Sequence, residues 1–139
     1  MKRLDNSAKI PVKGFKRTPQ RLAILEYLDG NKSHPSAEDV FKAVSRKYQS
    51  MSFATVYNTL NALVEAGVLK GLNIDPERRR FDPDTSPHHH CICLMCRKII
   101  DVYAEMDVRL PAGLAADFEP VSSHVEFYSL CSKCSKKAR

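Results

Sequence analysis

The feature of this sequence that most constrains its fold is a pair of Cys-x-x-Cys motifs far apart in the chain. Cys93 and Cys96 form the first motif, and Cys131 and Cys134 form the second. Two such pairs supply the four thiolates of a closed tetrahedral zinc site, which can stabilise a domain too small to fold well by hydrophobic packing alone. We therefore expect the fold to bring the two motifs together around a structural zinc ion.

Disulfide bonds are the alternative use for these cysteines. The sequence has five cysteines but lacks the apolar N-terminal segment that is typical of secreted proteins. Because disulfides belong mainly to oxidising compartments, metal binding is the better interpretation. The sequence also lacks an apolar run long enough to cross a membrane. We expect a soluble, cytoplasmic protein with no membrane partner.

A histidine-rich stretch, His88-His89-His90-Cys91-Ile92, directly precedes the first cysteine motif. If it forms a strand, its side chains alternate between faces, so His88 and His90 project from one face while His89 and Cys91 project from the other. One strand could then serve a second metal site, rich in nitrogen and oxygen donors and built around His88 and His90. The other ligands of that site must come from elsewhere in the chain.

The N-terminal half is predicted to form three short helices. Thr18 caps a helix over residues 19 to 29 that has proline at its first position. Ser36 and Asp39 form a capping box at the start of a second helix, which is expected to extend to about residue 48. Ser52 caps a third helix that ends at Gly67.

After the third helix the hydrophobic period changes to that of strands. Residues 68 to 74 and 78 to 82 flank an Asp-Pro-Glu turn, which is typical of a hairpin. Three helices followed by a hairpin indicate a winged helix-turn-helix, whose third helix would enter the major groove of DNA. The net charge of +6 favours a polyanionic partner.

Candidate DNA contacts lie on the third helix and on basic segments to either side of it. The helix carries polar side chains suited to base edges, and the cations could neutralise phosphates. Taken alone, either pattern is more often a solvated surface, and only their combination favours DNA binding. The expected contacts are Lys16, Arg17, Thr55, Tyr57, Asn58, Arg78 and Arg79, with Arg80 beside them and a loose basic arm over residues 1 to 17.

Two prolines between residues 83 and 87 indicate a hinge between a first domain, residues 1–83, and a second, residues 84–139. In the second domain we expect the histidine strand, a strand over 98 to 103, a short helix near 114 to 117 and a last strand over 121 to 130. That last strand has apolar residues on both faces, which so small a domain cannot cover, so pairing with a second copy is expected. The fold class is therefore α+β: an N-terminal winged helix followed by a small α/β dimerisation domain with a four-cysteine zinc site.

Nearly the whole chain resembles the ferric uptake regulator superfamily of bacterial metal-dependent transcription factors. The motifs that carry the resemblance keep the order and spacing of that family. They are Thr18-Pro19-Gln20-Arg21, His34-Pro35-Ser36-Ala37-Glu38-Asp39, Ala54-Thr55-Val56-Tyr57-Asn58, His88-x-His90 and the two Cys-x-x-Cys pairs. The resemblance implies a homodimer that binds double-stranded operator DNA and holds a regulatory metal at the hinge.

Carried over position by position, the family's regulatory ligands are His34, Asp82, His88, His90 and Asp101. Three imidazoles and two carboxylates make a borderline site suited to Fe(II), Mn(II) or Zn(II). Taken singly, His34 could equally be a turn residue before proline, and either aspartate a solvated residue at a strand end. Ligands drawn from both domains would turn metal binding into a change of shape.

Two positions bear on the branch of the family. Iron-sensing members generally have a glutamate where this chain has Asp101 and an arginine where it has Asn58. In both positions the chain is similar to the peroxide-responsive repressors, in which iron-catalysed oxidation of a ligating histidine releases DNA. That similarity implies His34 and His88 as oxidation targets. An iron-responsive uptake regulator without peroxide chemistry is the alternative.

The chain departs from the family pattern in places. Cys91 replaces an apolar residue and is interpreted as a small hydrophobe, with a second redox target as the alternative. Arg97 follows Cys96 where glycine is common, at a position that often needs a positive φ. An auxiliary metal site is disfavoured, because Val108 and Ser123 replace ligands and His124 falls on the other face.

An enzyme using an open metal position to activate water is the rival of a different class. The sequence has no general base at helix-coded spacing, such as His-Glu-x-x-His, and a chain this short that also forms a winged helix leaves little room for a substrate pocket. We therefore expect a regulator rather than an enzyme.

Overall fold

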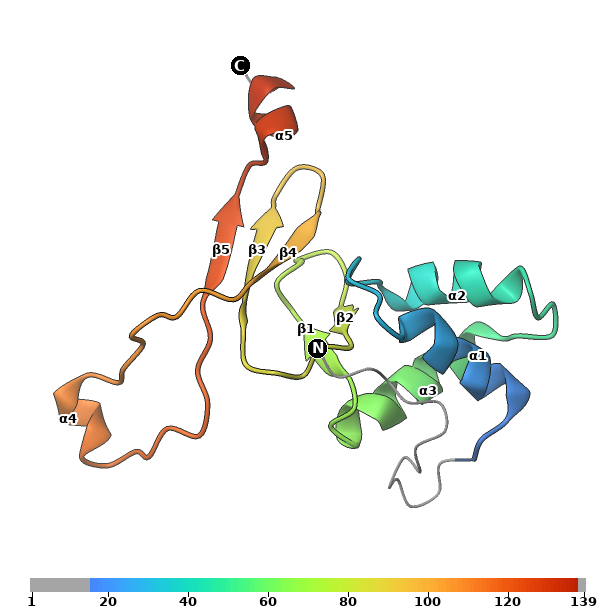
Figure 1. Cartoon of the computed structure of the whole chain (residues 1–139), viewed down its shortest axis with the longest axis horizontal. Helices are drawn as coiled ribbons and strands as arrows, with labels where there is room; N and C mark the ends of the chain where they lie inside the picture. The colour runs from blue at the N-terminus through green and yellow to red at the C-terminus, as the bar shows by residue number, and fades with distance from the viewer. Residues whose placement is uncertain (1–15, 138–139) are drawn as a thin grey trace. The chain divides into compact units, whose positions relative to one another are not determined.

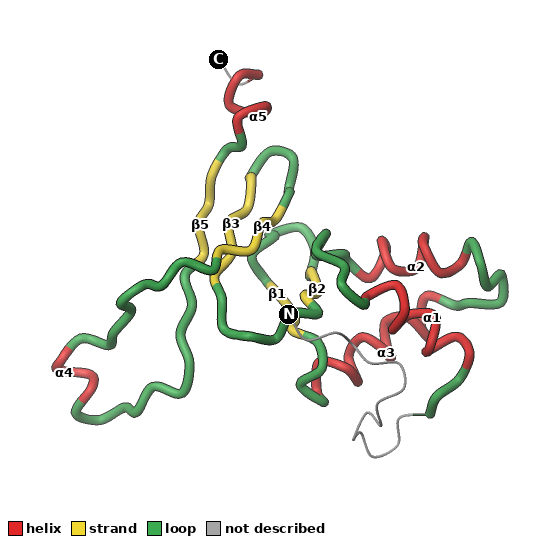
Figure 2. Tube along the Cα trace, viewed as in Figure 1, coloured by secondary structure: helices red, strands yellow, loops and turns green. Residues whose placement is uncertain are grey.

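The computed structural model describes residues 16 to 137, and the chain divides after Ser86 into two compact units (Figure 1). Of the basic arm predicted over residues 1 to 17, only Lys16 and Arg17 fall within the described residues. Each unit has its own sheet, and the three longest helices of the described chain all lie in the first unit (Figure 2). No helix within the described range 16 to 137 is both long enough and apolar enough to span a bilayer.

The first unit begins with three helices, α1 (Pro19–Leu28), α2 (Ala37–Ser45) and α3 (Phe53–Glu65). The predicted caps are present: Thr18 and Ser52 each accept a backbone N–H, and Ser36 forms the capping box with Asp39. The end predicted for the second helix was wrong. After Ser45 the chain tightens into a turn, in which the N–H groups of residues 47 and 48 both bond the same Val44 carbonyl.

The three helices enclose one hydrophobic core. Its residues share nearly complete burial and come from the three helices, from β2 and from the segments that join these elements. They are Ile24, Leu25, Leu28, Ala37, Val40, Val44, Met51, Val56, Leu60, Leu63, Leu69 and Phe81. Each fully buried aliphatic side chain contributes roughly 1.5 to 3 kcal/mol relative to exposure, so this core stabilises the first unit by packing alone.

The helices lead into an antiparallel hairpin of β1 (Lys70–Leu72) and β2 (Arg80–Asp82). Both strands are shorter than predicted. The reason lies in Asp75, whose carboxylate accepts the N–H of Glu77 and pairs with the buried Arg80 side chain at 3.0 Å. The segment between the strands is thereby folded around Asp75 and does not continue the ladder.

The second unit is a three-stranded sheet with β3 (His89–Cys93) in the centre. The neighbouring strand β4 (Ile99–Val102) runs antiparallel to it, and β5 (Glu126–Ser129) runs parallel on its other side. The helices α4 (Ala112–Ala115) and α5 (Ser132–Lys137) complete the unit. Figure 1 shows α4 within the long connection from β4 to β5, and α5 following β5 at the end of the chain.

The second unit differs from the prediction in the start of its last strand and in one helix that was not predicted. The last strand begins at Glu126 rather than at residue 121. Its ladder starts opposite His90, and the N–H of the preceding Val125 bonds the side chain of His89 instead of the backbone of β3. Helix α5 was not predicted, because it is short, rich in serine and lysine, and without an apolar stripe. This helix carries Cys134, so it matters for the metal site.

Candidate metal centres and nucleic-acid face

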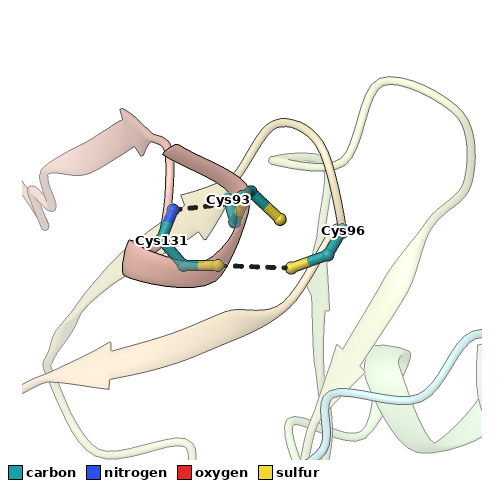
Figure 3. A group of neighbouring side chains, drawn as sticks. Cys93, Cys96 and Cys131 are labelled. Atoms are coloured by element: carbon teal, nitrogen blue, oxygen red, sulfur yellow. Dashed lines mark hydrogen bonds between the residues drawn. The ribbon is translucent and has the colours of Figure 1, made fainter. Parts of the chain in front are cut away.

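The four predicted zinc ligands lie together. The Sγ atoms of Cys93, Cys96, Cys131 and Cys134 are all within 4.8 Å of one another. Cys96 Sγ and Cys131 Sγ are 3.9 Å apart (Figure 3). Four Zn–S bonds of about 2.3 Å in a tetrahedron separate the sulfur atoms by about 3.8 Å, so the cluster fits one zinc ion. The five cysteines, all within the described residues, form no disulfide.

Local backbone geometry builds this cluster. Between β3 and β4 the chain turns back on itself, with the Arg97 N–H donating to the Cys93 carbonyl at 2.8 Å. Arg97 has φ 65°, so the positive φ predicted for this position is confirmed despite its side chain. On the other side, α5 follows Cys131 directly and carries Cys134 inward to a buried position.

The thiols differ in how easily they ionise. The Cys131 backbone N–H donates to Cys93 Sγ at 3.3 Å and lowers the pKa of Cys93 to about 6. A backbone N–H from Cys134 likewise lowers the pKa of Cys131, whereas the hydrogen bond to Cys131 raises the pKa of Cys134 to about 12. Adjacent thiolates repel one another, so a divalent cation is what would let all four ionise together.

A second cluster of possible metal ligands, with nitrogen and oxygen donors in place of sulfur, lies near the first residues of β3. Asp101 faces His90 across the β3–β4 ladder, and one of its carboxylate oxygens lies 3.3 Å from His90 Nε2. The same oxygen lies 2.9 Å from His88 Nε2. The His88 ring stacks on Tyr103 with its centroid 5.0 Å away. Two imidazole nitrogens thus converge on one carboxylate oxygen, an arrangement that a divalent metal ion can share.

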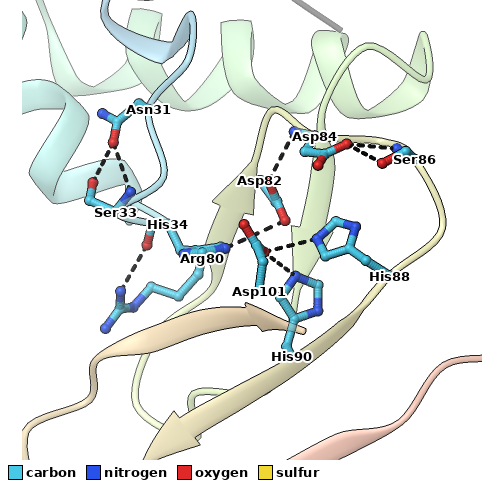
Figure 4. A network of polar contacts seen from close by, with 10 residues as sticks. All are labelled: Asn31, Ser33, His34, Arg80, Asp82, Asp84, Ser86, His88, His90 and Asp101. Carbon is cyan, nitrogen blue, oxygen red and sulfur yellow. Dashed lines mark hydrogen bonds and ion pairs between the residues drawn. The ribbon is translucent and has the colours of Figure 1, made fainter. Parts of the chain in front are cut away.

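The other two predicted ligands pair within the first unit. His34 Nε2 lies 3.5 Å from Asp82 Oδ2, and both side chains are buried. The backbone N–H of Asp84 donates to the other Asp82 oxygen at 2.9 Å and orients the carboxylate. Figure 4 draws both groups of ligands. All five predicted ligands therefore fall into two sets, His34 with Asp82 in the first unit and His88, His90 and Asp101 in the second.

The predicted base-reading residues lie on α3. Asn58 is exposed and Tyr57 is 47% exposed, with its ring stacked on Phe53. Thr55 is half-buried, and its hydroxyl lies 2.8 Å from the hydroxyl of the cap residue Ser52. Tyr57 and Asn58 are thus open to a ligand, while Thr55 also serves the start of the helix.

The basic residues separate into three kinds. Lys16 and Arg17 are exposed before α1, and Arg78 is exposed with a long contact of 3.9 Å to Asp75. Arg79 is exposed, but it donates to Asn61 on α3 at 3.2 Å and covers the Phe81 ring. The expectation that Arg80 contacts phosphate was wrong. Its side chain is buried, because it pairs with Asp75 inside the first unit.

Three further polar residues of the second unit have local partners. His89 Nδ1 accepts the backbone N–H of Val125 at 2.8 Å and so joins β3 to the approach of β5. His124 lies 3.3 Å from Glu126 on the surface. Cys91 is half-buried, with its sulfur 3.2 Å from the Ser129 hydroxyl. All three side chains thus contact the segment that begins or forms β5.

Comparison with known proteins places these features in a family. The model of the ferric uptake regulator family matches residues 12–128. A peroxide operon regulator of Bacillus subtilis is 44% identical over 126 residues, covering 89% of this chain and 87% of that protein. A peroxide-responsive repressor of Staphylococcus epidermidis is 36% identical over 135 residues, covering 96% and 90%. The chain belongs to the ferric uptake regulator family.

A solved structure of the same family also matches. The ferric uptake regulator of Francisella tularensis, determined with iron, superimposes with a TM-score of 0.71 at 28% identity, covering 88% of this chain and 96% of that one. The α+β fold is therefore that of the ferric uptake regulator family. Proteins of this family carry the names of regulators and not of enzymes, in keeping with the expectation from sequence.

The sequence reasoning missed two features that surround the ligands in this ferric uptake regulator fold. One is the buried Asp75–Arg80 pair, and the other is the turn in which Asp84 supports Asp82. Both depend on how the hairpin and the following loop fold, and the first has no recognisable sequence pattern. The Asp-x-Asp spacing after β2 was the available signal for the second.

Proposed function

We propose that this chain is a metal-dependent DNA-binding repressor that senses hydrogen peroxide. The observation that carries the proposal is the convergence of His88 and His90 on a single oxygen of Asp101. Aspartate at this position is the residue that distinguishes the peroxide-responsive branch in the sequence analysis. The 44% identity to a protein named as a peroxide operon regulator supports the same function.

The first domain would bind DNA, and the second would form the dimer. Residues 1–83 would form a winged helix-turn-helix, in which α3 reads bases through Tyr57 and Asn58 while the β1–β2 hairpin is the wing. Phosphate contacts would come from Lys16, Arg17, Arg78 and Arg79, with Thr55 at the start of the reading helix. Residues 84–139 would form the dimerisation domain. A homodimer acting on operator DNA in the cytoplasm follows from this assignment.

Pairing with a second copy has support in the surface of the second unit. Its sheet leaves large apolar side chains exposed on both outer strands, Ile100 on β4 and Phe127 and Tyr128 on β5, and Leu130 is exposed directly after β5. Exposed apolar area of this kind is unfavourable in a monomer and is usually covered by a partner. A symmetric dimer would bury the same strands of both copies.

We assign the four cysteines to structural zinc and the other five ligands to a regulatory Fe(II) or Mn(II) ion. One ion held by His34, Asp82, His88, His90 and Asp101 would join the two units. Asp82 and His88 are six positions apart in the chain, so the connecting segment keeps them within about 20 Å even when extended. Metal binding would fix the geometry of the two DNA-binding units of a dimer.

Peroxide sensing would then depend on which metal is bound. Fe(II) held by these residues would supply the redox chemistry that activates hydrogen peroxide. Peroxide would be the oxidant: one of its oxygen atoms would be added to the imidazole ring of His34 or His88, and the other would leave as water. Loss of that ligand would free the two units from each other and release the operator. Mn(II) would support DNA binding without this chemistry.

The test begins with a DNA site selected from a random duplex library by the Mn(II) form. Binding to that site is then measured for the Fe(II) and Mn(II) forms before and after peroxide, with peptide mass spectrometry of both. We expect only the Fe(II) form to release DNA and to gain oxygen on His34 or His88. Release in neither form would make the chain an iron-responsive regulator, and equal release with oxidised cysteines would make it a thiol switch.

Ligand variants test the metal site itself. His90→Ala or Asp101→Ala should leave zinc, dimer and fold intact and abolish metal-dependent operator binding. Since loss of a residue that merely supports a ligand already costs about 10 to 100-fold in metal affinity, loss of the ligand should cost at least that much. Either variant responding to Mn(II) like the parent would refute the assignment.

A further inference from the structure

The loop that carries His34 is fastened to strand β2 by consecutive contacts within the first unit. The Phe81 N–H donates to the Pro35 carbonyl at 2.9 Å, and Ser36 forms a bridge with Arg80. Beside them, Arg80 Nη1 donates to the His34 carbonyl at 2.8 Å (Figure 4). The hairpin and the His34 loop therefore form one connected body.

Arg80 is the side chain that completes this connection. Its Nε donates to Asp75 Oδ2 at 3.0 Å, while its Nη1 reaches the His34 carbonyl. A planar guanidinium can hold two partners at fixed angles, whereas a lysine ammonium is a point charge without a second arm. Burying such a charge is costly unless it is paired, so the site is built to keep Arg80 in one orientation.

His34 needs such support. Its backbone has φ 52°, in the left-handed region that residues other than glycine rarely adopt. A residue held in this conformation persists only when its surroundings determine it, and such residues gather at functional sites. The following Pro35 restricts the loop on one side, and the Arg80 hydrogen bond fixes the carbonyl of His34 itself.

We propose that Arg80 is a positioning residue for the metal ligand His34 and that, through β2, it couples this ligand to the hairpin that carries Arg78 and Arg79. The inference rests on the proposed function, in which His34 holds the regulatory metal and the hairpin contacts DNA. Asp75 anchors the guanidinium, and β2 carries both Arg80 and the second ligand, Asp82. A change at Arg80 therefore acts on metal binding through His34.

Arg80→Lys is the first test, because lysine keeps a positive charge beside Asp75 but cannot also bond the His34 carbonyl. Mn(II) affinity is measured without DNA, by electron paramagnetic resonance of the free ion, on the zinc-loaded protein. Since the supporting partners of metal ligands typically contribute 10 to 100-fold to affinity, we expect about a tenfold loss. Asp75→Asn, which weakens the anchor and retains Arg80, should lose affinity in the same direction.

Arg78→Lys is the matched control. Arg78 also approaches Asp75, at 3.9 Å, but within the described residues 16 to 137 no hydrogen bond joins Arg78 to His34. Its Mn(II) affinity should equal that of the parent. If Arg78→Lys and Arg80→Lys weaken Mn(II) binding equally, the effect is a general one of hairpin charge and the proposal is overturned.

A double-mutant cycle separates positioning from general damage. His34→Ala should weaken Mn(II) binding, and adding Arg80→Lys to it should cause no further loss, because Arg80 has no ligand left to position. Additive losses would overturn the proposal. If His34→Ala weakens binding but Arg80→Lys and Asp75→Asn do not, this inference alone fails. If His34→Ala has no effect, the proposed regulatory site fails, and the inference fails with it.

Discussion

The two units of the chain are stabilised by different means. The first encloses a core of twelve buried residues drawn from the three helices, from β2 and from the segments that join these elements. In the second, the buried apolar residues are Ile92, Ile99 and two cysteines of the metal cluster, while large apolar side chains of β4 and β5 stay exposed. Packing suffices for the first unit, whereas the second unit buries too few apolar side chains to be stabilised by packing alone. A regulatory change in one can therefore leave the other folded.

The largest loss of stability is expected from removing a zinc ligand of the second unit. Cys93→Ser removes a ligand from the cluster, and structural zinc contributes about 10 to 16 kcal/mol of folding free energy in small domains. We expect the second unit to lose zinc, structure and dimerisation, while helical circular dichroism from the first unit persists. Zinc content and sedimentation measure the outcome.

Cys91→Ser is the matched control for that experiment. Its thiol lies outside the cluster, beside the Ser129 hydroxyl, so zinc and dimer should be retained. A zinc-free Cys93→Ser protein that remains a stable dimer would show that the second unit does not depend on its metal, and the contrast between the units would be lost.

Leu60→Ala tests the other side of the contrast. Leu60 is fully buried in α3, and truncating such a leucine costs about 2 to 5 kcal/mol. The first unit should unfold at lower denaturant concentration, with the zinc content and the hydrogen-exchange protection of β3 unchanged. Loss of zinc in step with the first unit would mean that the two units fold as one.

The same contrast explains what the sequence could predict. Helix starts at Thr18, Ser36 and Ser52 depend on a few neighbouring residues, and so does the positive φ of Arg97, so local patterns sufficed for them. The four cysteines followed from their spacing. Strand lengths did not, because a ladder extends only as far as its partner does, as at the start of β5.

Tertiary pairing accounts for the errors around the ligands. Arg80 belongs to a run of three arginines that looks like a solvated basic patch, and only the folded hairpin shows that Asp75 draws this one inward. His34 and Asp82, which are far apart in sequence, were expected together only from a family resemblance, because no spacing pattern connects them. The helix α5 lacked a pattern altogether.

A change on the exposed face of the first unit should affect function without stability. Asn58→Ala should cost about 1 to 3 kcal/mol of binding free energy on the selected DNA site, and much less on random DNA, because a base contact is lost.

Lys16→Ala should weaken binding to the selected site and to random DNA alike, and it should reduce the salt dependence of binding. Both affinities are measured by fluorescence anisotropy of the Mn(II) form. Equal losses for Asn58→Ala on the two DNAs would rule out base reading.

The smallest change in stability is expected from Gly71→Ala in β1. A Cβ at this position would collide with the Arg79 guanidinium, which lies across the glycine between Asn61 and Phe81. Arg79 is exposed, so its side chain can move away from the new methyl group at a small cost. Alanine also restricts the unfolded chain, which stabilises the folded state by about 0.4 to 1 kcal/mol and offsets that cost. Thermal stability should therefore barely change.

DNA binding by Gly71→Ala should change more than its stability, because the displaced guanidinium loses its hydrogen bond to Asn61 on α3, the helix proposed to read bases. Arg79→Ala is the matched variant, and the two substitutions together should weaken DNA binding no more than Arg79→Ala alone. If Gly71→Ala binds DNA like the parent while Arg79→Ala binds it weakly, the position of Arg79 against Asn61 and Phe81 does not affect its contact with phosphate. If Gly71→Ala and Arg79→Ala both bind DNA more weakly while the core of the first unit is unchanged, two different sets of residues serve this unit. Core packing then determines its stability, and exposed side chains outside the core determine its DNA affinity.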